Sequence, residues 1–339
     1  MTELWVSCCL FEQEERELLR RWGHSASVVS RSAARWVALL FGGYGGRMRL
    51  DDLMEVVIEE KGFFQAETLP LFVVRAARVD PNEGPRPCGR EKHASAHTLD
   101  GALFVCFGRR SPRDALGDAW LFSNNEWTKV EAAGQWPRGR WSHTATAIGS
   151  RVVVVGGRDH IGPLSDSLYV LESGIGWTSH DCEPLDAHVA VYDEDIGRLV
   201  VFGGTSGERR EGKVYLEENL SMKLCPLLER DRGSAAARLD RDHTLVVGTF
   251  SCGHGVDATP KRNDLNVSFF DDKNARTWPR VYYSSKISPF PIHAQALHLD
   301  DGLVLLVGGG APCFAFGPVF GDTLILLSTQ RKEKYRTKF

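Results

Sequence analysis

The sequence predicts an all-β fold, a six-bladed β-propeller, and three observations support this prediction. The chain has 339 residues, 42% of them hydrophobic and 34 of them glycine, which suits a globular protein with a sizeable core. Short runs of Val, Leu and Phe that end in glycine recur six times. A histidine lies at a similar distance ahead of five of these runs. A small sheet cannot bury both of its faces alone, whereas six sheets packed around an axis can.

The six apolar runs are expected to be buried strands, because they are too short and too rich in β-branched residues for helices. They cover residues 37–41, 103–107, 152–155, 199–202, 245–247 and 303–307. Further strand segments follow at 51–53, 117–121, 166–170, 214–216, 263–265 and 322–325. Trp127, Trp177 and Trp278 come near the ends of their units and are expected to fill the space between neighbouring blades. Two stretches, 71–89 and 251–262, interrupt this pattern as irregular segments.

The recurring histidines are His24, His93, His143, His188 and His293. The first glycine after the run follows the histidine by 18 residues in unit one, 13 in unit three and 15 in units four and six. This spacing matches a kelch repeat of roughly 50 residues with four strands per blade. A residue repeated once per blade is expected to be structural. We therefore predict partly buried imidazoles that hydrogen-bond between strands.

The two ends of the chain are expected to differ. The sixth unit has about three strand signals, and the N-terminal strand, about 3–11, is apolar. We predict that this strand completes the last blade, which removes an exposed sheet edge; the alternative is a frayed tail. One propeller domain is thus expected over residues 1–328. The basic tail, 329–339, is expected to be disordered and at most a weak phosphate contact.

Charge and composition argue against several classes of protein. The 41 Lys and Arg residues against 44 Asp and Glu give a net charge of −3, which argues against nucleic-acid binding by bulk charge but leaves local basic patches open. No apolar run reaches the ~18–20 residues of a membrane-spanning helix, and the start has no basic secretory signal. The eight cysteines contain no C-x-x-C pair. We therefore expect free thiols in a reducing compartment and a cytoplasmic protein.

No catalytic residue, metal site or cofactor is expected. The glycine-rich segments 42–46 and 308–310 lack the following helix that a nucleotide-binding loop requires. The sequence has neither a Gly-x-Ser-x-Gly elbow nor a His-Glu-x-x-His zinc helix. Cys252, His254 and Asp257 place only one sulfur and one imidazole close together, which favours a loop over a metal site.

Basic residues gather in the loops that follow the apolar runs, and equivalent loops of a propeller lie on one face. This predicts a basic rim around the central funnel, suited to carboxylate or phosphate because arginine presents a fixed fork of donors. The candidate binding residues are Arg47, Arg109, Arg110, Arg158, His160, Arg209, Arg210 and Arg262. The alternative is an ordinary solvated set of loops whose field is cancelled by Asp114, Asp159, Glu208 and Glu211.

The last unit carries a more specific pattern. It reads Gly-Gly-Gly-Ala-Pro-Cys-Phe-Ala-Phe-Gly over 308–317, preceded by Pro-Phe-Pro-Ile-His over 289–293. This resembles the closing blade of the kelch domain in the tRNA wybutosine-synthesizing protein 4 family, also called leucine carboxyl methyltransferase 2. The resemblance implies a role in making wybutosine, the tricyclic base beside the anticodon of phenylalanine tRNA. In that family a methyltransferase domain that uses S-adenosylmethionine precedes the kelch domain.

The repeats of this chain begin near residue 21, with no segment before them that could hold S-adenosylmethionine. Whether the chain is an enzyme therefore stays open, and no catalytic residue is transferred. The expected function is a recognition or scaffold module that places a tRNA or a tRNA-modifying enzyme. The alternative is a peptide-binding kelch adaptor, such as the substrate receptor of a ubiquitin ligase. A third hypothesis is an enzyme with its site in the funnel. No membrane partner is expected.

Overall fold

The computed structural model describes most of the chain. The described residues are 4–10, 12–63, 70–165, 168–194, 197–204, 212–217, 220–225, 235–241, 243–248, 266–270, 275–277, 281–283, 292–313, 317–320 and 324–329. Strands dominate these ranges, and their only α-helix is α1 (Gln13–Leu19). Within them, no helix has the length and apolar character needed to cross a membrane.

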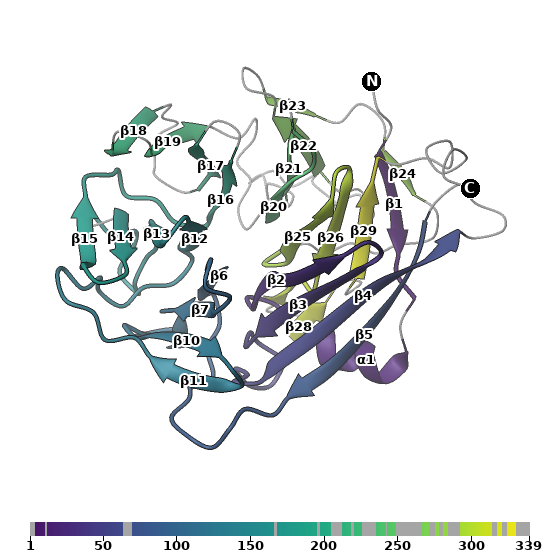
Figure 1. Ribbon diagram of the computed structural model, residues 1–339, viewed down its shortest axis with the longest axis horizontal. Coiled ribbons are helices and arrows are strands. Elements are labelled where there is room, and N and C mark those ends of the chain that lie inside the picture. Colours follow the sequence, from purple (N-terminus) through teal and green to yellow (C-terminus); the bar gives the residue numbers. More distant parts are fainter. Residues whose placement is uncertain are drawn as a thin grey trace.

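Six sheets of four or five strands surround a central axis (Figure 1). Four of them are regular antiparallel meanders. The first two contain β2 (Ser25–Ser32), β3 (Arg35–Phe41), β4 (Leu53–Phe63) and β5 (Pro70–Val79), then β6 (Ala94–His97), β7 (Leu103–Cys106), β10 (Ala119–Ser123) and β11 (Glu126–Lys129). The other two contain β12 (Thr144–Ile148), β13 (Arg151–Val155), β14 (Leu168–Glu172) and β15 (Gly176–His180), then β20 (Ala235–Arg238), β21 (Thr244–Gly248), β22 (Asn266–Phe270) and β23 (Ala275–Thr277).

Two sheets depart from this plan. One contains β16 (His188–Asp193), β17 (Arg198–Gly203), β18 (Gly212–Glu217) and β19 (Leu220–Cys225). Its order is β16-β17-β19-β18, because β19 rather than β18 pairs with β17, in parallel. The other has the order β24-β1-β29-β26-β25. Its strands are β24 (Val281–Tyr283), β1 (Leu4–Cys8), β29 (Leu324–Ser328), β26 (Leu303–Val307) and β25 (Gln295–Asp300).

The all-β propeller that the sequence predicts is confirmed. Of the six blades that it predicts, four are regular blades, and the other two sheets depart from that plan. A period-two pattern identifies a strand but does not say which neighbour it pairs with, so the exchange of β18 and β19 leaves no mark on the sequence. Residues 70–79, which the sequence treats mostly as irregular, form β5, and 251–262 lies outside the described residues.

The N-terminal strand lies inside the five-stranded sheet. β1 pairs antiparallel with β29, placing Val6 opposite Leu327, and pairs in parallel with β24. Both Val6 and Leu327 are completely buried. The first strand of the chain therefore joins the sheet that its last described strand also forms, as the apolar start of the sequence predicts.

The first strands of the sheets line the centre of the ring. β2, β6, β12, β16, β20 and β25 each contact the next in this order, and β25 contacts β2 again. Aromatic side chains pack farther out, between the sheets. The Trp127 ring of the second blade lies 5.2 Å from the Phe41 ring of the first, and that of Trp177 lies 6.1 Å from Phe107 of the blade before it. The predicted role of these two tryptophans is confirmed, and Trp278 lies outside the described residues.

A charge placed on the face of β1 should open the five-stranded sheet. We expect Val6→Asp to lower the free energy of unfolding by about 3 kcal/mol, because it buries a carboxylate without a partner. Leu10→Asp is the matched control, since Leu10 is 46% exposed and should tolerate the change. Denaturant titration measures both, and equal losses would contradict the packing of β1 described here.

Candidate functional site

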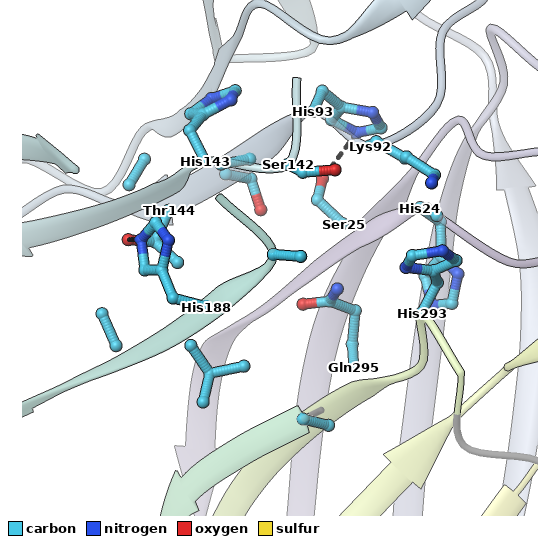
Figure 2. Close-up of a pocket in the computed structure, with 18 of the residues that line it drawn as sticks. His24, Ser25, Lys92, His93, Ser142, His143, Thr144, His188, His293 and Gln295 are labelled. Carbon is cyan, nitrogen blue, oxygen red and sulfur yellow. Dashed lines mark hydrogen bonds between the residues drawn. The ribbon is translucent and has the colours of Figure 1, made fainter. Parts of the chain in front are cut away.

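The candidate site lies at one end of the central channel. Antiparallel pairing of Ser25 with Phe41 and of Thr144 with Val155 shows that the loop after each second strand lies at the end where the first strand begins. A cavity of about 250 Å³ opens there. We call this end the channel mouth, and Figure 2 shows side chains from several blades around it. The described loops that carry Arg47, Arg109, Arg110, Arg158 and His160 therefore lie at the end where the channel opens.

Five residues of the channel mouth share an unusual backbone conformation. The residue just before each first strand or its histidine has a φ of +53° to +64°, in the left-handed region, in the five blades where this position is described. These residues, the mouth ring, are Gly23, Lys92, Ser142, Ala187 and His293. Four of the five are not glycine, so the surrounding structure must hold them in this conformation.

Backbone hydrogen bonds join the mouth ring from blade to blade. The N–H of Gly23 donates to the carbonyl of His293 at 3.1 Å, and that of Lys92 donates to Gly23 at 2.6 Å. The series continues from Ser142 to Lys92 at 2.9 Å and from Ala187 to Ser142 at 3.0 Å. Each of the four blades in this series thus donates one N–H to the preceding blade, and the left-handed conformation turns these groups sideways along the ring.

The recurring histidines are buried between the blades. His24, His93, His143 and His188 are at most 6% exposed. The Nε2 atoms of His93 and His188 lie 2.9 Å from the Ser25 hydroxyl and 3.0 Å from the Thr144 hydroxyl of the preceding blade. That blade's glycine provides the space, because a Cβ on Gly156 would lie 2.6 Å from Cε1 of His188. For His93 and His188 these contacts confirm the structural role that their recurrence predicts.

His293 differs from the other histidines, and grouping it with them is wrong. It occupies the mouth ring, in line with Lys92 and Ser142, while Ala294 occupies the position of the buried histidines. Its ring packs against Trp22 at 5.8 Å between centroids. The spacing from histidine to glycine pair varies from 13 to 18 residues across the units, so a shift of one position could not be seen in the sequence.

Buried arginines fix the loops behind the mouth ring. Arg21 and Arg90 are at most 2% exposed and bind Asp52 and Asp118 through two hydrogen bonds each, at 2.6–3.0 Å and 2.8 Å. Their Nη1 atoms also donate to carbonyls of Gly42 and Phe107 at 3.0 Å. These charges are satisfied inside the protein and are not available to a ligand.

The structure brings two of the predicted rim residues to the channel mouth, where each is paired. Arg109 Nε lies 2.8 Å from Glu91 Oε1, and the Arg109 guanidinium stacks over Trp141 at 5.4 Å. Arg158 Nη1 lies 3.2 Å from Asp186 Oδ2. The carboxylates of Glu91 and Asp186 are buried, with side chains 1% and 3% exposed. Sequence reasoning missed both acids because neither belongs to the loops that carry the arginines.

The other predicted rim residues are exposed or undescribed. Arg47 and His160 are exposed, and Arg110 is exposed and paired with Asp114 at 2.8 Å. The Asp159 carboxylate accepts hydrogen bonds from the backbone N–H groups of Ile161 and Gly162. Arg209, Arg210 and Arg262 lie outside the described residues, as do Glu208 and Glu211. Partial cancellation of the basic rim is therefore observed, by Asp114 and by the two buried acids.

The opposite end of the channel holds a second cavity, of about 460 Å³. Arg31, Arg238 and Arg241 line it, and Arg238 pairs with Asp193 at 3.0 Å. Sequence reasoning missed this group because these residues lie at or near the far ends of first strands rather than in the arginine-rich loops. Among the described residues, three or more His, Cys, Asp or Glu side chains do not gather as metal ligands, and Cys252, His254 and Asp257 lie outside that part.

The left-handed position of Ala187 gives a stability test of the mouth ring. We expect Ala187→Gly to raise the free energy of unfolding by about 0.5–1 kcal/mol, because glycine adopts a φ of +53° without the Cβ clash. Ala145→Gly in β12 is the control and should lower stability by a similar amount. Denaturant titration distinguishes the signs, and a loss of stability in Ala187→Gly would oppose the strained ring.

Acidification should destabilise the protein through its buried histidines. Burial lowers the pKa of His24 and His188 to about 3, so the unfolded chain binds protons between pH 6.5 and 3 that the folded state refuses. Their contribution to stability is full above pH 6.5 and falls as pH drops. Between pH 7 and 5, His188→Gln should lose about 1–2 kcal/mol less stability than the unmodified chain.

Denaturant titration at several pH values measures this difference. His160→Gln, which removes an exposed histidine, is the matched control. An identical pH dependence in His188→Gln and the unmodified chain would show that His188 is not held neutral by the fold.

Comparison with known proteins identifies two matching families. The family model described as "tRNA wybutosine-synthesizing protein 4, beta-propeller" matches residues 87–323, more than half of the chain. The "KLHDC2/KLHL20/DRC7 Kelch-repeats domain" matches residues 7–157. The two matches overlap across the second blade and the first two strands of the third, so both include the Arg109 and Lys92 side of the channel mouth.

Two of three similar proteins carry a name of the first family, and the third is a dynein chain. The chain is 25% identical over 284 residues to tRNA wybutosine-synthesizing protein 4 of Eremothecium gossypii, covering 72% of this chain and 36% of the relative. It is 32% identical over 146 residues to tRNA wybutosine-synthesizing protein 2/3/4 of Arabidopsis thaliana, covering 42% of this chain and 13% of the relative. It is also 32% identical over 166 residues to the flagellar outer-arm dynein alpha chain of Chlamydomonas reinhardtii, covering 46% and 3%. The chain thus spans about a third or less of these relatives.

Proposed function

We propose that this chain, which belongs to the tRNA wybutosine-synthesizing protein 4 β-propeller family, is a recognition module in the wybutosine modification of phenylalanine tRNA. The match over residues 87–323 carries this proposal, because it covers most of the ring and the relatives it resembles are named for that modification. The propeller acts as a scaffold, and the methyl transfer of the family takes place outside these residues. This role places the chain in the cytoplasm.

In this proposal the six sheets act as six blades of one closed ring. The channel mouth is the recognition face, because the arginine-bearing loops of successive blades meet there. Arg109 and Arg158 are fixed in place by buried acids, while Arg47 and Arg110 are exposed around them. The charges of Arg109 and Arg158 are offset by buried carboxylates and that of Arg110 by the exposed Asp114, so we expect Arg47 and Arg110, whose side chains reach solvent, to supply most of the attraction for phosphate.

A peptide-binding adaptor is the second candidate. The match of residues 7–157 to the KLHDC2/KLHL20/DRC7 kelch-repeats domain favours it, and so does the cavity at the channel mouth, which is concave and lined by fixed polar groups. A peptide held in this cavity would depend on hydrogen bonds and shape more than on long-range charge.

The two functions differ in their response to salt. We expect phenylalanine tRNA to bind with an affinity that falls steeply as salt rises. Arg47→Gln combined with Arg110→Gln should reduce the log–log salt slope by about 1–2 and weaken binding several-fold. Arg75→Gln combined with Arg78→Gln is the matched control, because these arginines are 65% and 69% exposed on the outer strand β5.

Fluorescence titration with labelled tRNA measures all three proteins. Equal losses of tRNA affinity in the two double variants would show that the channel mouth is not the recognition face. Absence of tRNA binding, together with binding of a peptide that changes little with salt, would replace the first function by the second.

A further inference from the structure

Among the described residues of the mouth ring, Lys92 has the only long aliphatic side chain, and this side chain extends across the channel mouth. Its ring neighbours Gly23, Ser142 and Ala187 have small side chains or none. A Cβ added to Gly23 would lie 3.4 Å from Cγ of Lys92, so the lysine passes over the neighbouring blade. In Figure 2 its amine points toward His24 and His293. The small residue at Gly23 leaves this path open.

The Lys92 amine has no hydrogen-bond or ion-pair partner in the described part of the chain, although cations surround it. Arg109 and Arg158 both destabilise the charged form of the amine. Glu91 and Asp186 stabilise the charged form, but by less than burial and the two arginines destabilise it. The two carboxylates are already engaged by Arg49, Arg109 and Arg158. Burial, the largest cause, and these cations lower the pKa of Lys92 to about 8.

We propose that Lys92 is a nucleophilic amine that forms a Schiff base with a small carbonyl compound bearing a carboxylate or phosphate. Lysine amines that are partly desolvated and stand beside other cations are activated in this way. The neutral amine attacks the carbonyl carbon and forms a C–N bond. The carbonyl oxygen then takes up protons and leaves as water, so that a C=N bond remains.

The surroundings of Lys92 select the size and charge of the carbonyl compound. The cavity of about 250 Å³ admits a small molecule beside the amine. Four cationic side chains, Arg49, Arg109, Arg158 and Lys92, meet only two carboxylates there. An anionic substituent is therefore attracted to the mouth, whereas a neutral carbonyl compound gains nothing from the arginines.

His293 is placed to assist the loss of water. It lies in the mouth ring next to Gly23, and burial, followed by the charges of Lys92 and Arg109, holds its pKa well below the ordinary histidine value. His293 is therefore neutral at pH 7, and a neutral imidazole can both accept and donate a proton. Neighbouring His24 and His93 are also kept neutral by burial, so they add no charge to the mouth.

Reductive trapping of the full chain tests this proposal. The chain is incubated at pH 7 with glyoxylate, a small anionic aldehyde, and cyanoborohydride, and the modified lysines are mapped by peptide mass spectrometry. With a pKa of about 8, about one Lys92 in ten is neutral at pH 7, against about one in 3,000 for an ordinary lysine. We expect Lys92 to be labelled at least about tenfold faster than exposed Lys129 in the same molecule.

Three comparisons make the result decisive. Glycolaldehyde, which is neutral, should label Lys92 several-fold more slowly than glyoxylate, with no such difference at Lys129. The rate at Lys92 should rise with pH and level off near pH 8–9. Labelling of Lys92 no faster than Lys129, or without preference for glyoxylate, would overturn the proposal.

Lys92→Arg separates this proposal from the recognition function. The variant retains the positive charge but lacks the primary amine, so the rapid labelling should disappear. Loss of the fast-labelled site supports the Schiff base whatever the outcome of the tRNA titration. Persistence of a fast-labelled lysine elsewhere in Lys92→Arg would show that the reactive amine is not Lys92.

Discussion

The fold depends on the hydrogen bonds that join the mouth ring from blade to blade. Each bond requires a backbone turned into the left-handed region, a conformation that Lys92, Ser142, Ala187 and His293 adopt only at a cost. A blade cannot satisfy its own group at this position, because the acceptor belongs to the blade before it. The ring therefore has to form as a whole, and the strained residues are stable only within it.

The buried histidines follow the same principle. An imidazole from one blade fills the space above the glycines of the preceding blade, as His188 does above Gly156, and bonds to a hydroxyl there. The histidine and the glycine each have a structural role only where the two sheets meet. The arginines Arg21 and Arg90 act within their own blades and fix the loops that carry the next interface. Local and inter-blade contacts thus alternate around the axis.

Structural features that depend on a local sequence pattern could be predicted, whereas features that depend on which strands or side chains pair could not. The buried strands, the interblade positions of Trp127 and Trp177, and the N-terminal strand could be predicted from apolar runs and repeat spacing. The parallel pairing of β17 with β19 could not, because both candidate strands have the same period. At the site, the arginine loops were visible, but their pairing with Glu91 and Asp186 joins residues 18 and 28 positions apart. The sequence did not single out Lys92, because only the structure shows that its equivalents in three other blades are the smaller residues Gly23, Ser142 and Ala187.

The placement of β1 beside β29 has a consequence for biosynthesis. β1 is synthesised well before its antiparallel partner β29, because the paired residues Val6 and Leu327 lie 321 positions apart in the chain. Until β29 is made, the apolar face of Leu4 and Val6 has no sheet to join, and the five-stranded sheet cannot close. Closure of this sheet therefore depends on a contact with a very large sequence separation, the kind of contact that forms late and leaves a nascent chain dependent on chaperones.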